Sequence, residues 1–312
     1  MVKEVVSVKL PVNESLVIQK NVLEPDNKTG NEKRVCIVTG THGDELEGQY
    51  VCYEVNRIIQ SQKHKLKGIV EIYPALNPMG IDSITRGIPL FDLDMNRTFP
   101  GSSDGAMTEY VAAKIIDDIK GSDLCIDIHS SNIYLTEIPQ IRISEETAET
   151  LIPYGKELNI DFIWVHEAAT VLHSTLAHSL NSIGVPTLVV EMGVGMRVTQ
   201  RYGQELVDGI FNLLTKMGVW ESEEYIKVKK PIISTGYKVE FINAAASGMF
   251  IPCIKHWQTV KKNETIGQIV DPLKGEVLSE VKSPCDGSVF TLREYPVVYN
   301  GSLIARILGG LE

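Results

Sequence analysis

Residues 40–48 read Gly-Thr-His-Gly-Asp-Glu-Leu-Glu-Gly and come just after a short apolar run, Val-Cys-Ile-Val at 35–38. A run of this length and composition predicts a buried strand. His42 and Glu45 then lie three residues apart at the carboxyl end of that strand. In an open α/β sheet, ligands bind where the carboxyl ends of parallel strands gather. The stretch therefore predicts both a parallel sheet and a functional site at one of its edges.

Two further apolar runs end in a residue of the same kind. The run at 124–128 leads into His129, and the run at 187–190 leads into Glu191. If the three runs form parallel strands of one sheet, two imidazoles and two carboxylates meet in a single crevice. Zinc in catalytic sites takes three protein ligands of these types and keeps a fourth position open. The pattern thus predicts a zinc site built from three strand ends.

Strand and helix patterns alternate along the chain as far as about residue 222. This alternation predicts an α/β domain over residues 1–222, with a mostly parallel sheet and helices on both of its faces. Residues 223–312 instead show short strand-like runs broken by Gly, Pro and Asn, without a helical period. We therefore predict a second, smaller unit that is all-β, a barrel or a sandwich.

One segment of the first unit departs from the alternation. Residues 75–101 form a long stretch that is rich in Pro and Gly and has no core-facing period. Long loops in compact domains are usually functional or disordered, and the aromatic, Arg and Asn content here favours function. Regular helices are expected on either side. One runs from residue 44 or 45 to 63, and Asp104 opens another, with an apolar residue every fourth position from Val111.

The composition is that of an ordinary globular protein. The 312 residues are 43% hydrophobic and 22% charged. The formal net charge is −10 and no basic run is present, which argues against nucleic acid or a membrane surface as a partner. No apolar stretch approaches the roughly 20 residues of a membrane-spanning helix, and we find no signal-peptide core. The five cysteines form no Cys-x-x-Cys pair, which fits reduced thiols and a cytoplasmic location.

The residue types at the strand ends would support hydrolysis. His42, Glu45 and His129 form a His2Glu ligand set for zinc, which lowers the pKa of a bound water to about 7. Glu191 is then the natural general base, because it can take the proton of the water and pass it to the leaving amine. The predicted chemistry is therefore hydrolysis through a metal-activated water.

The long loop supplies the remaining candidate groups. Arg86 is placed to stabilise the oxyanion of a tetrahedral intermediate. The pair Asn96-Arg97 would bind a substrate carboxylate, since a guanidinium group matches a carboxylate bidentately. Taken singly, each candidate has a simpler interpretation, such as a surface ion pair or a group that orders the loop. Their joint occurrence at three strand ends and in the loop between them favours a site.

Four motifs together resemble a known family. They are GTHGDELEG at 40–48, DLDMNRTFPG at 92–101, DIHSS at 127–131 and VVEMG at 189–193. As a set they are similar to the succinylglutamate desuccinylase and aspartoacylase family, within the zinc carboxypeptidase-like superfamily, over roughly the first 220 residues. The family hydrolyses the amide of N-acylated amino acids.

The resemblance implies a mixed eight-stranded sheet flanked by helices and one zinc ion per chain. It assigns the roles already inferred from the residues: His42, Glu45 and His129 as ligands, Glu191 as base, Arg86 at the oxyanion, Asn96 and Arg97 at a substrate carboxylate. The β unit is also similar to the C-terminal domain of the family. Its sequence pattern resembles that of a biotinyl/lipoyl-type barrel-sandwich. In the family this domain narrows the active-site entrance so that only small substrates enter.

The chain departs from the family pattern at two substrate contacts. Ile304 stands where aspartoacylases carry a late tyrosine that reaches the active site, so Tyr295 or Tyr299 would have to substitute. The arginine that grips the second carboxylate of the substrate has no obvious match. The helix that would carry it offers two histidines instead, and three other arginines are spare cations that could equally lie at the surface: His173, His178, Arg142, Arg197 and Arg201.

We therefore predict a zinc-dependent amidohydrolase, a deacylase that acts on a small N-acyl amino acid or a related N-acylated amine. The alternative is a metallocarboxypeptidase that acts on short peptides, which would need an open cleft. A binding protein that kept the fold and lost the chemistry is a further reading, and so is a carrier module. The carrier reading is weak, because no lysine of the β unit lies in a Met-Lys-Met or Asp-Lys-Ala context. A homo-oligomer is compatible with every reading.

Overall fold

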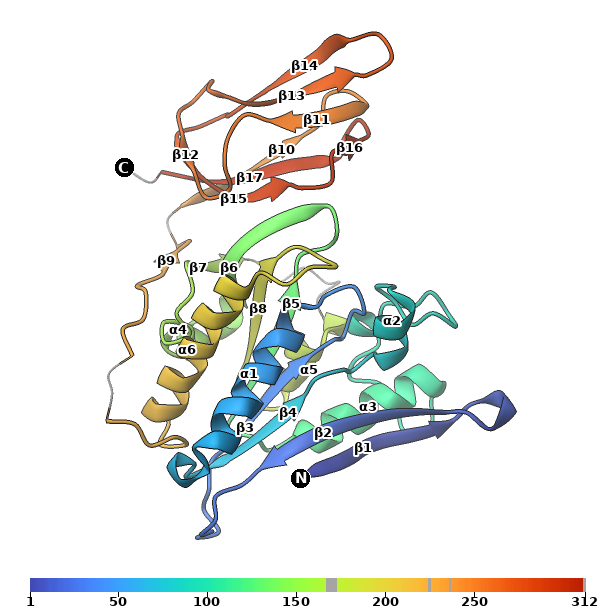
Figure 1. Ribbon diagram of the computed structural model, residues 1–312, viewed down its shortest axis with the longest axis vertical. Helices are drawn as coiled ribbons and strands as arrows, with labels where there is room; N and C mark the ends of the chain where they lie inside the picture. The colour runs from blue at the N-terminus through green and yellow to red at the C-terminus, as the bar shows by residue number, and fades with distance from the viewer. Residues whose placement is uncertain (167–172, 224–225, 236, 311–312) are drawn as a thin grey trace.

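The computed structural model describes residues 1–166, 173–223, 226–235 and 237–310. Its centre is a large mixed sheet (Figure 1). Four neighbouring strands in the order β4-β3-β5-β8 are parallel, while β2 and β6 flank them in the antiparallel sense. The strands up to residue 193 are β1 (Val2–Lys9), β2 (Ser15–Leu23), β3 (Arg34–Thr39), β4 (Ile69–Tyr73), β5 (Leu124–Ser130), β6 (Leu135–Ser144), β7 (Phe162–His166) and β8 (Thr187–Gly193).

The central parallel strands form because their sequences are apolar on both faces. All seven residues of β5 are buried, and so are five of the six residues of β3. Runs of this kind are typical of parallel strands that are covered on both sides. The structure thus confirms the three predicted strands that lead to the candidate site.

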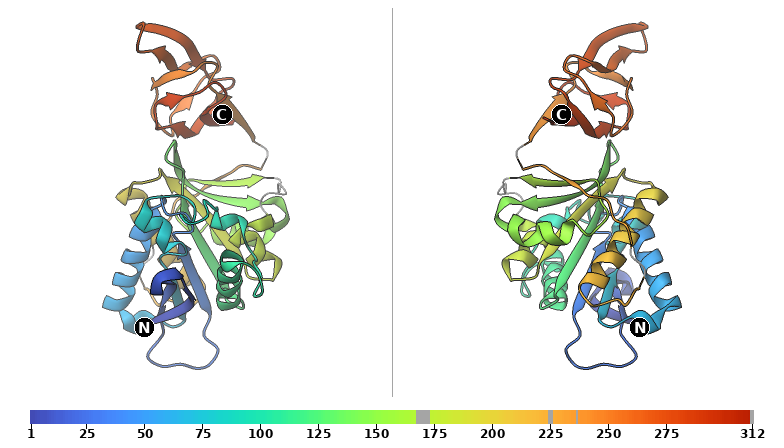
Figure 2. Two further views of the ribbon diagram at one scale, coloured as in Figure 1. Left: turned by 90° about the vertical axis from the view of Figure 1, so that its right-hand side faces the viewer. Right: turned by 90° about the vertical axis from the view of Figure 1, so that its left-hand side faces the viewer.

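Helices cover both faces of the sheet (Figure 2). Helices α1 and α6 pack on each other and on one face, and α3 and α5 pack on the other. The helices are α1 (Glu47–Ser61), α2 (Pro78–Ser83), α3 (Met107–Ile119), α4 (Ala148–Gly155), α5 (Leu176–Ser182) and α6 (Gln200–Lys216), with 3-10 turns η1 (Pro11–Asn13), η2 (Lys63–Lys65), η3 (Met95–Arg97) and η4 (Glu145–Thr147). The mixed α/β class with helices on both faces is confirmed.

Two helix boundaries differ from the predictions. Helix α1 begins at Glu47, because residues 40–46 form the loop that carries the candidate ligands. Helix α3 begins at Met107 and not at Asp104, because the Glu109 carboxylate accepts a hydrogen bond of 2.9 Å from the backbone N–H of Ala106 and so fixes the helix start there. The predicted apolar face of α3 is confirmed.

The stretch at 75–101, predicted to be irregular, contains short α2 and η3. Asn77 caps α2, since its Oδ1 accepts a hydrogen bond of 2.9 Å from the N–H of Gly80. Asp94 caps η3 in the same way, with a hydrogen bond of 2.8 Å from the N–H of Asn96. The rest of the stretch is turns, so it remains a long structured loop that lies beside the carboxyl ends of the parallel strands.

The C-terminal β unit continues the main sheet. Its strand β15 pairs with β6, and β17 and β10 follow, so the sheet has thirteen strands among the described residues. The unit also has a four-stranded sheet and an apolar core of its own (Figure 1). Its strands are β10 (Lys238–Asn243), β11 (Gly248–Pro252), β12 (Thr259–Val260), β13 (Thr265–Asp271), β14 (Glu276–Lys282), β15 (Gly287–Arg293), β16 (Val297–Val298) and β17 (Leu303–Gly309), with β9 (Ile232–Ile233) in the linker.

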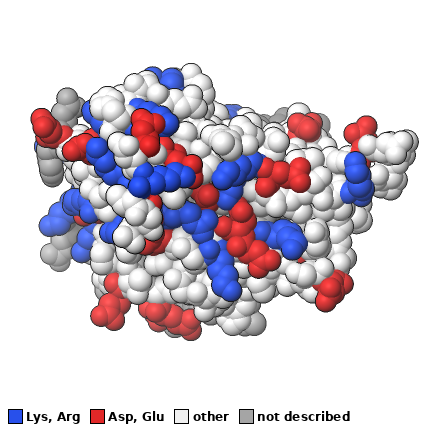
Figure 3. Space-filling model, turned by 90° about the horizontal axis from the view of Figure 1, so that it is seen from below, with Lys and Arg blue, Asp and Glu red and all other residues white. Residues whose placement is uncertain are grey.

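The described residues of this unit from 238 to 310 are strands and turns, as predicted. A closed barrel-sandwich stays a prediction, as does the division at residues 222 and 223. Across the described residues, the helices are too short or too polar for a passage through a bilayer. Figure 3 shows one face of the molecule, on which basic and acidic side chains are interspersed.

Candidate metal centre and active site

The loop that carries His42 and Glu45 is held tightly against the long loop. Gly40 has φ +68°, a left-handed conformation that favours glycine, and its carbonyl accepts a hydrogen bond of 2.8 Å from the N–H of Asn77. The N–H of Gly43 donates to the carbonyl of Arg86 at 3.2 Å. The backbone thus fixes where the two side chains point, and it explains why glycines surround the His-x-x-Glu pair.

Gly43 gives a direct test of this packing. A Cβ at residue 43 would overlap the backbone of Gly80 and Ile81. We expect Gly43→Ala to shift the loop and to weaken metal binding at least about tenfold, because a displacement of about 1 Å is enough to cost a hundredfold in a positioned site. Zinc titration by calorimetry measures the change. Gly155→Ala is the matched control, since a Cβ there meets only the ends of isoleucine side chains, and unchanged zinc affinity in Gly43→Ala would contradict the prediction.

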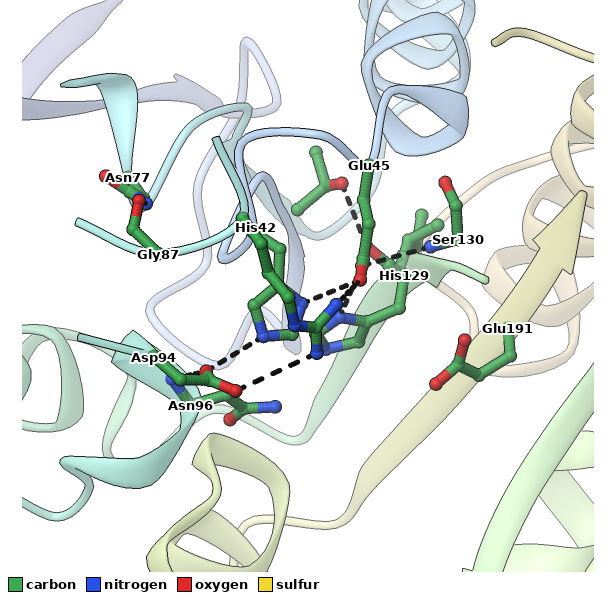
Figure 4. Close-up of polar contacts among 12 residues, drawn as sticks. His42, Glu45, Asn77, Gly87, Asp94, Asn96, His129, Ser130 and Glu191 are labelled. Atoms are coloured by element: carbon green, nitrogen blue, oxygen red, sulfur yellow. Dashed lines mark hydrogen bonds and ion pairs between the residues drawn. The ribbon is translucent and has the colours of Figure 1, made fainter. Parts of the chain in front are cut away.

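The three predicted metal ligands meet in space (Figure 4). One ligand atom from each of His42, Glu45 and His129 lies within 4.8 Å of the others, and all three side chains are at most 4% exposed. Nδ1 of His42 lies 2.8 Å from Oε1 of Glu45, and Nδ1 of His129 lies 2.9 Å from Oε2. The backbone N–H of Ser130 donates to the same carboxylate at 3.2 Å. Both imidazoles therefore turn the same nitrogen toward the carboxylate between them.

A carboxylate stands behind each imidazole. Nε2 of His42 is 2.9 Å from Oδ1 of Asp94, and Nε2 of His129 is 3.1 Å from Oδ2 of Asp127. A carboxylate on the far nitrogen fixes the tautomer and the ring orientation of a histidine ligand. With Nε2 of each ring facing these carboxylates, Nδ1 is the nitrogen that would offer its lone pair to a cation beside Glu45 once its proton is lost.

This arrangement fits a divalent cation. Nδ1 of His42 is buried and has no partner in hydrogen-bond geometry, although it lies close to Glu45. Burial lowers the pKa of His129, but Asp127 and Glu45 outweigh burial and raise it well above its ordinary value. Burial raises the pKa of Asp94, but His42 outweighs burial and lowers it to about 2. A cation that binds here would displace protons from the two rings.

Arg86 also reaches this cluster. Its Nη1 donates to Oε1 of Glu45 at 2.7 Å, and its Nη2 lies 3.8 Å from Oδ2 of Asp94. The loop at 75–101 therefore brings its arginine to the ligands as predicted, and the role of Arg86 at an oxyanion stays a prediction.

Glu191 lies at the end of β8, beside His129 in the parallel register with β5 (Figure 4). Burial raises the pKa of Glu191; Arg142 opposes this shift and Glu137 adds to it, and the result is a pKa of about 7. A carboxyl group poised near neutrality is suited to take and return a proton. Nη1 of Arg142 lies 3.1 Å from Oε1 of Glu191.

Six of the seven predicted site residues line one cavity of about 400 Å³, and the seventh, Glu45, contacts two of them. Asn96 and Arg97 are among the six. Oδ1 of Asn96 accepts a hydrogen bond of 2.9 Å from the N–H of Leu176, and Nη1 of Arg97 donates to the carbonyl of Asn96 at 2.7 Å. Both residues therefore order the loop as well as face the cavity, and their role at a carboxylate stays a prediction.

The cavity extends away from the metal ligands toward η4 and α5. Its far wall carries hydroxyl, amide and imidazole groups and one acidic group, from Ser144, Glu146, Thr147, His166, Thr175, His178, Asn181 and Ser182. His178 stacks on His173 with ring centroids 4.6 Å apart. Among the described residues, those that line the cavity all precede residue 192, so the predicted narrowing of the entrance by the β unit stays a prediction.

The residues considered for the two missing substrate contacts lie in different places in the structure. Ile304 is fully buried in the core of the β unit. Tyr295 and Tyr299 are exposed and are not among the residues that line the cavity. Arg197 and Arg201 are surface residues, which pair with Glu294 and Glu205.

Sequence reasoning left the role of Arg142 open and missed three acidic residues. Arg142 is half-buried beside Glu191 and is not a surface residue. Asp94, Asp127 and Glu137 were not identified at all. A signal existed for Asp127, because alternate residues of a strand face the same side and Asp127 precedes His129 by two positions. Glu137 lies on β6, in a stretch to which the sequence assigns no element.

A carboxylate between two imidazoles at the carboxyl edge of a mixed α/β sheet, with a second carboxylate beside them, is a set of groups that metal-dependent hydrolases use. Comparison with known proteins identifies the group within that class. Residues 31–217 match the model of the succinylglutamate desuccinylase/aspartoacylase catalytic domain. The match spans more than half of the chain, so the protein belongs to this family, as its motifs predicted.

Individual relatives extend the similarity to nearly the whole chain. The N-alpha-acetyl-L-2,4-diaminobutyric acid deacetylase of Halomonas elongata is 24% identical, over 97% of this chain and 91% of the relative. The product-bound ectoine utilization protein EutE (DoeB) from Ruegeria pomeroyi superimposes with a TM-score of 0.82 at 19% identity, over 97% and 93% of the two chains. A succinylglutamate desuccinylase/aspartoacylase from Rhodobacter sphaeroides gives 0.81 at 22% identity, over 98% and 93%. The structural likenesses show that the fold is shared.

Proposed function

We propose that the protein is a zinc-dependent deacylase that hydrolyses the amide of a small N-acyl amino acid or a related N-acylated amine. The observation that carries the proposal is the meeting of His42, Glu45 and His129 within 4.8 Å, beside a cavity that His42, His129 and Glu191 line. The family of the chain and the deacetylase among its relatives support the same reaction.

His42, Glu45 and His129 would hold the zinc ion. When bound, zinc lowers the pKa of water and polarises a carbonyl oxygen, which makes amide hydrolysis feasible near neutral pH. Asp94 and Asp127 keep the two imidazoles in the tautomer that offers Nδ1 to a ligand.

Glu191 acts on protons. In the proposed reaction its carboxylate takes a proton from the attacking water and gives it to the nitrogen of the leaving amine. The burial that raises the pKa of Glu191 suits it to both halves of this transfer, because a base with a pKa near the working pH accepts and releases a proton with little loss.

Two arginines handle negative charge. Arg86 stands 2.7 Å from the ligand Glu45, within reach of an oxyanion that develops beside the ligands. Arg97 and Asn96 line the same cavity and would bind the carboxylate of the amino acid. The far wall offers hydroxyl, amide and imidazole groups and Glu146, so we propose that the rest of the substrate is polar.

A substrate panel tests the reaction class. The zinc-loaded protein is assayed with N-acetyl, N-succinyl and N-formyl amino acids and with a short peptide. We expect hydrolysis of at least one acyl amino acid and a much slower reaction with the peptide. Faster cleavage of the peptide would favour a metallocarboxypeptidase and would overturn the deacylase proposal.

Metal removal gives a separate prediction. We expect about one zinc per chain by elemental analysis, loss of hydrolysis after dialysis against a chelator, and its return on addition of one equivalent of zinc. Activity that survives complete removal of divalent metal would contradict the proposed mechanism. A binding protein without catalysis would take up zinc and hydrolyse none of the panel.

The cellular location and the partners of the protein are proposed on indirect grounds. All five cysteines are free thiols, and Cys36, Cys52 and Cys125 are buried, which supports a reducing compartment such as the cytoplasm. The small-molecule substrate requires no macromolecular partner, and a homo-oligomer is compatible with the structure.

A further inference from the structure

We propose that Arg142 is the residue that positions the Glu191 carboxylate, and that the C-terminal β unit anchors Arg142 through Glu137 and Arg306. The inference rests on the proposed function, in which Glu191 is the general base. It assigns the β unit a part in catalysis that does not require contact with the substrate.

The contacts form an unbroken row of four charged groups. Nη1 of Arg142 lies 3.1 Å from Oε1 of Glu191, and Nη2 of Arg142 lies 2.7 Å from Oε2 of Glu137. The other oxygen of Glu137 lies 2.7 Å from Nη1 of Arg306, on β17 of the β unit. Each inner group bridges two partners of opposite charge, so none of the four can turn without breaking a contact of its neighbour.

Burial makes the row stiff. The side chain of Glu137 is only 2% exposed, and those of Arg306 and Glu191 are 16% and 15% exposed. The Nε2 amide of Gln140 also donates to Glu137. Where water is scarce, removal of one partner leaves a buried charge without compensation, which is strongly unfavourable. The row therefore resists local rearrangement.

An aromatic ring lies against both guanidinium groups. The guanidinium groups of Arg142 and Arg306 both contact the Trp164 ring. Their guanidinium carbons lie 5.6 Å and 5.5 Å from the ring centroid. Phe241 of the β unit lies against Arg306 at 5.5 Å. A planar guanidinium that stacks on a ring can present its N–H groups in only a few directions, which a lysine would not do.

The backbone explains how residues of three strands come into line. Glu137 and Arg142 are five apart on β6, and regular alternation would place them on opposite faces. The register of β6 against β8 shifts between Glu137 and Gln140, at a stretch that contains Pro139, and this bulge returns both side chains to one face. In the other direction Glu137 pairs with Thr291, and Thr291 pairs with Arg306.

The row ends at the base, and this gives it a function. Arg142 holds one oxygen of Glu191 and so sets the direction in which the Glu191 carboxylate faces the cavity. Both Nη atoms of Arg142 are engaged with carboxylates. Arg142 also lines the cavity. The competing role is therefore direct binding of the substrate, which kinetics can separate from positioning.

The test measures kcat and KM of the full-length, zinc-loaded protein with the N-acyl amino acid that is hydrolysed fastest in the panel. For Arg142→Met we expect kcat to fall about 100-fold and KM to stay within about twofold, because a base misplaced by about 1 Å costs this much. Arg142→Lys should recover part of the rate, since it keeps one ion pair with Glu191 but cannot bridge two carboxylates.

The outer members of the row should act through Arg142. We expect Glu137→Gln and Arg306→Met to lower kcat about tenfold, again without a matching change of KM, and to retain one zinc per chain. Arg197→Met is the matched control. Arg197 also makes an ion pair to the β unit, 2.7 Å to Glu294, but its side chain is 64% exposed and its partner is not a member of the row, so the kinetics of this variant should match those of the unaltered protein. Thermal melting identifies any variant that fails to fold. If Arg142→Met or Arg306→Met does not fold, the kinetics of Arg142→Lys and Glu137→Gln test the positioning role instead.

A double-mutant cycle separates this inference from the proposed function. If Arg142 acts through Glu191, then Arg142→Met should add almost nothing to Glu191→Gln. An undiminished further loss of kcat in that background, or a rise of KM with an intact kcat in the single variant, would overturn the positioning role. Full activity of Glu191→Gln would instead refute the base assignment on which the inference rests.

Discussion

Replacing Glu191 by Gln should lower kcat by about 1,000-fold or more while one zinc per chain remains bound. The amide keeps the size of the carboxylate but cannot accept a proton, so proton removal from water and protonation of the leaving amine both fail. General acid–base catalysis typically contributes between about 100- and 10,000-fold. A 1,000-fold loss corresponds to about 4 kcal/mol of transition-state stabilisation. Glu191 lies outside the ligand set, which is why the metal should stay.

The comparison needs kinetics and metal analysis on the same samples. Glu149→Gln is the matched control, because Glu149 is an exposed residue of α4 and does not line the cavity. Its kcat should be unchanged. If Glu191→Gln hydrolysed the substrate at the rate of the unaltered protein, Glu191 would have no part in the mechanism, and the cavity would need another base.

The convergence of the candidate ligands could be predicted because their positions depend on local sequence. An apolar run long enough for a buried strand fixes where β3, β5 and β8 end, and the next polar residues fall at the sheet edge. The shared location of His42, His129 and Glu191 can be predicted without knowing which strands are neighbours. All carboxyl ends of a set of parallel strands lie on one side of the sheet. The loop at 75–101 could be called functional on its length and composition alone.

Residues whose role depends on strand pairing could not be predicted in this way. Arg142 reaches Glu191 only because β6 runs antiparallel to β8 and contains a bulge. The sequence of β6 does not alternate cleanly, and its proline counts against a central strand. Asp94 reaches His42 across a separation of 52 residues. Such contacts follow from the assembled fold, and no local pattern specifies them.

The continuation of the sheet into the β unit also depends on strand pairing and could not be predicted from local sequence. The change in sequence pattern at about residue 223 predicted strands without helices, and the described residues from 238 to 310 are strands and turns. It could not indicate that β15 would pair with β6, because Thr291 and Glu137 are more than 150 residues apart and either strand could have ended a separate sheet. The charged row from Arg306 to Glu191 therefore could not be predicted from the sequence.

Replacing His129 by Ala should remove both zinc binding and hydrolysis. The variant loses one of three ligands, and it leaves Glu45 and Asp127 buried without the ring that now lies between them. Loss of a group that merely supports a ligand costs about 10- to 100-fold in metal affinity. Loss of the ligand itself should exceed that, so we expect zinc affinity to fall by more than about 100-fold. Calorimetric titration with zinc measures it directly.

Melting temperature offers a second readout that does not depend on activity. A ligand that binds only the folded state stabilises it by about 2.7 kcal/mol when its concentration is 100 times the Kd. Zinc should therefore raise the melting temperature of the unaltered protein and leave that of His129→Ala almost unchanged. His64→Ala, at an exposed histidine of η2, should keep the full shift. An equal shift in His129→Ala would mean that zinc binds elsewhere, and the convergence of His42, Glu45 and His129 would then need another explanation.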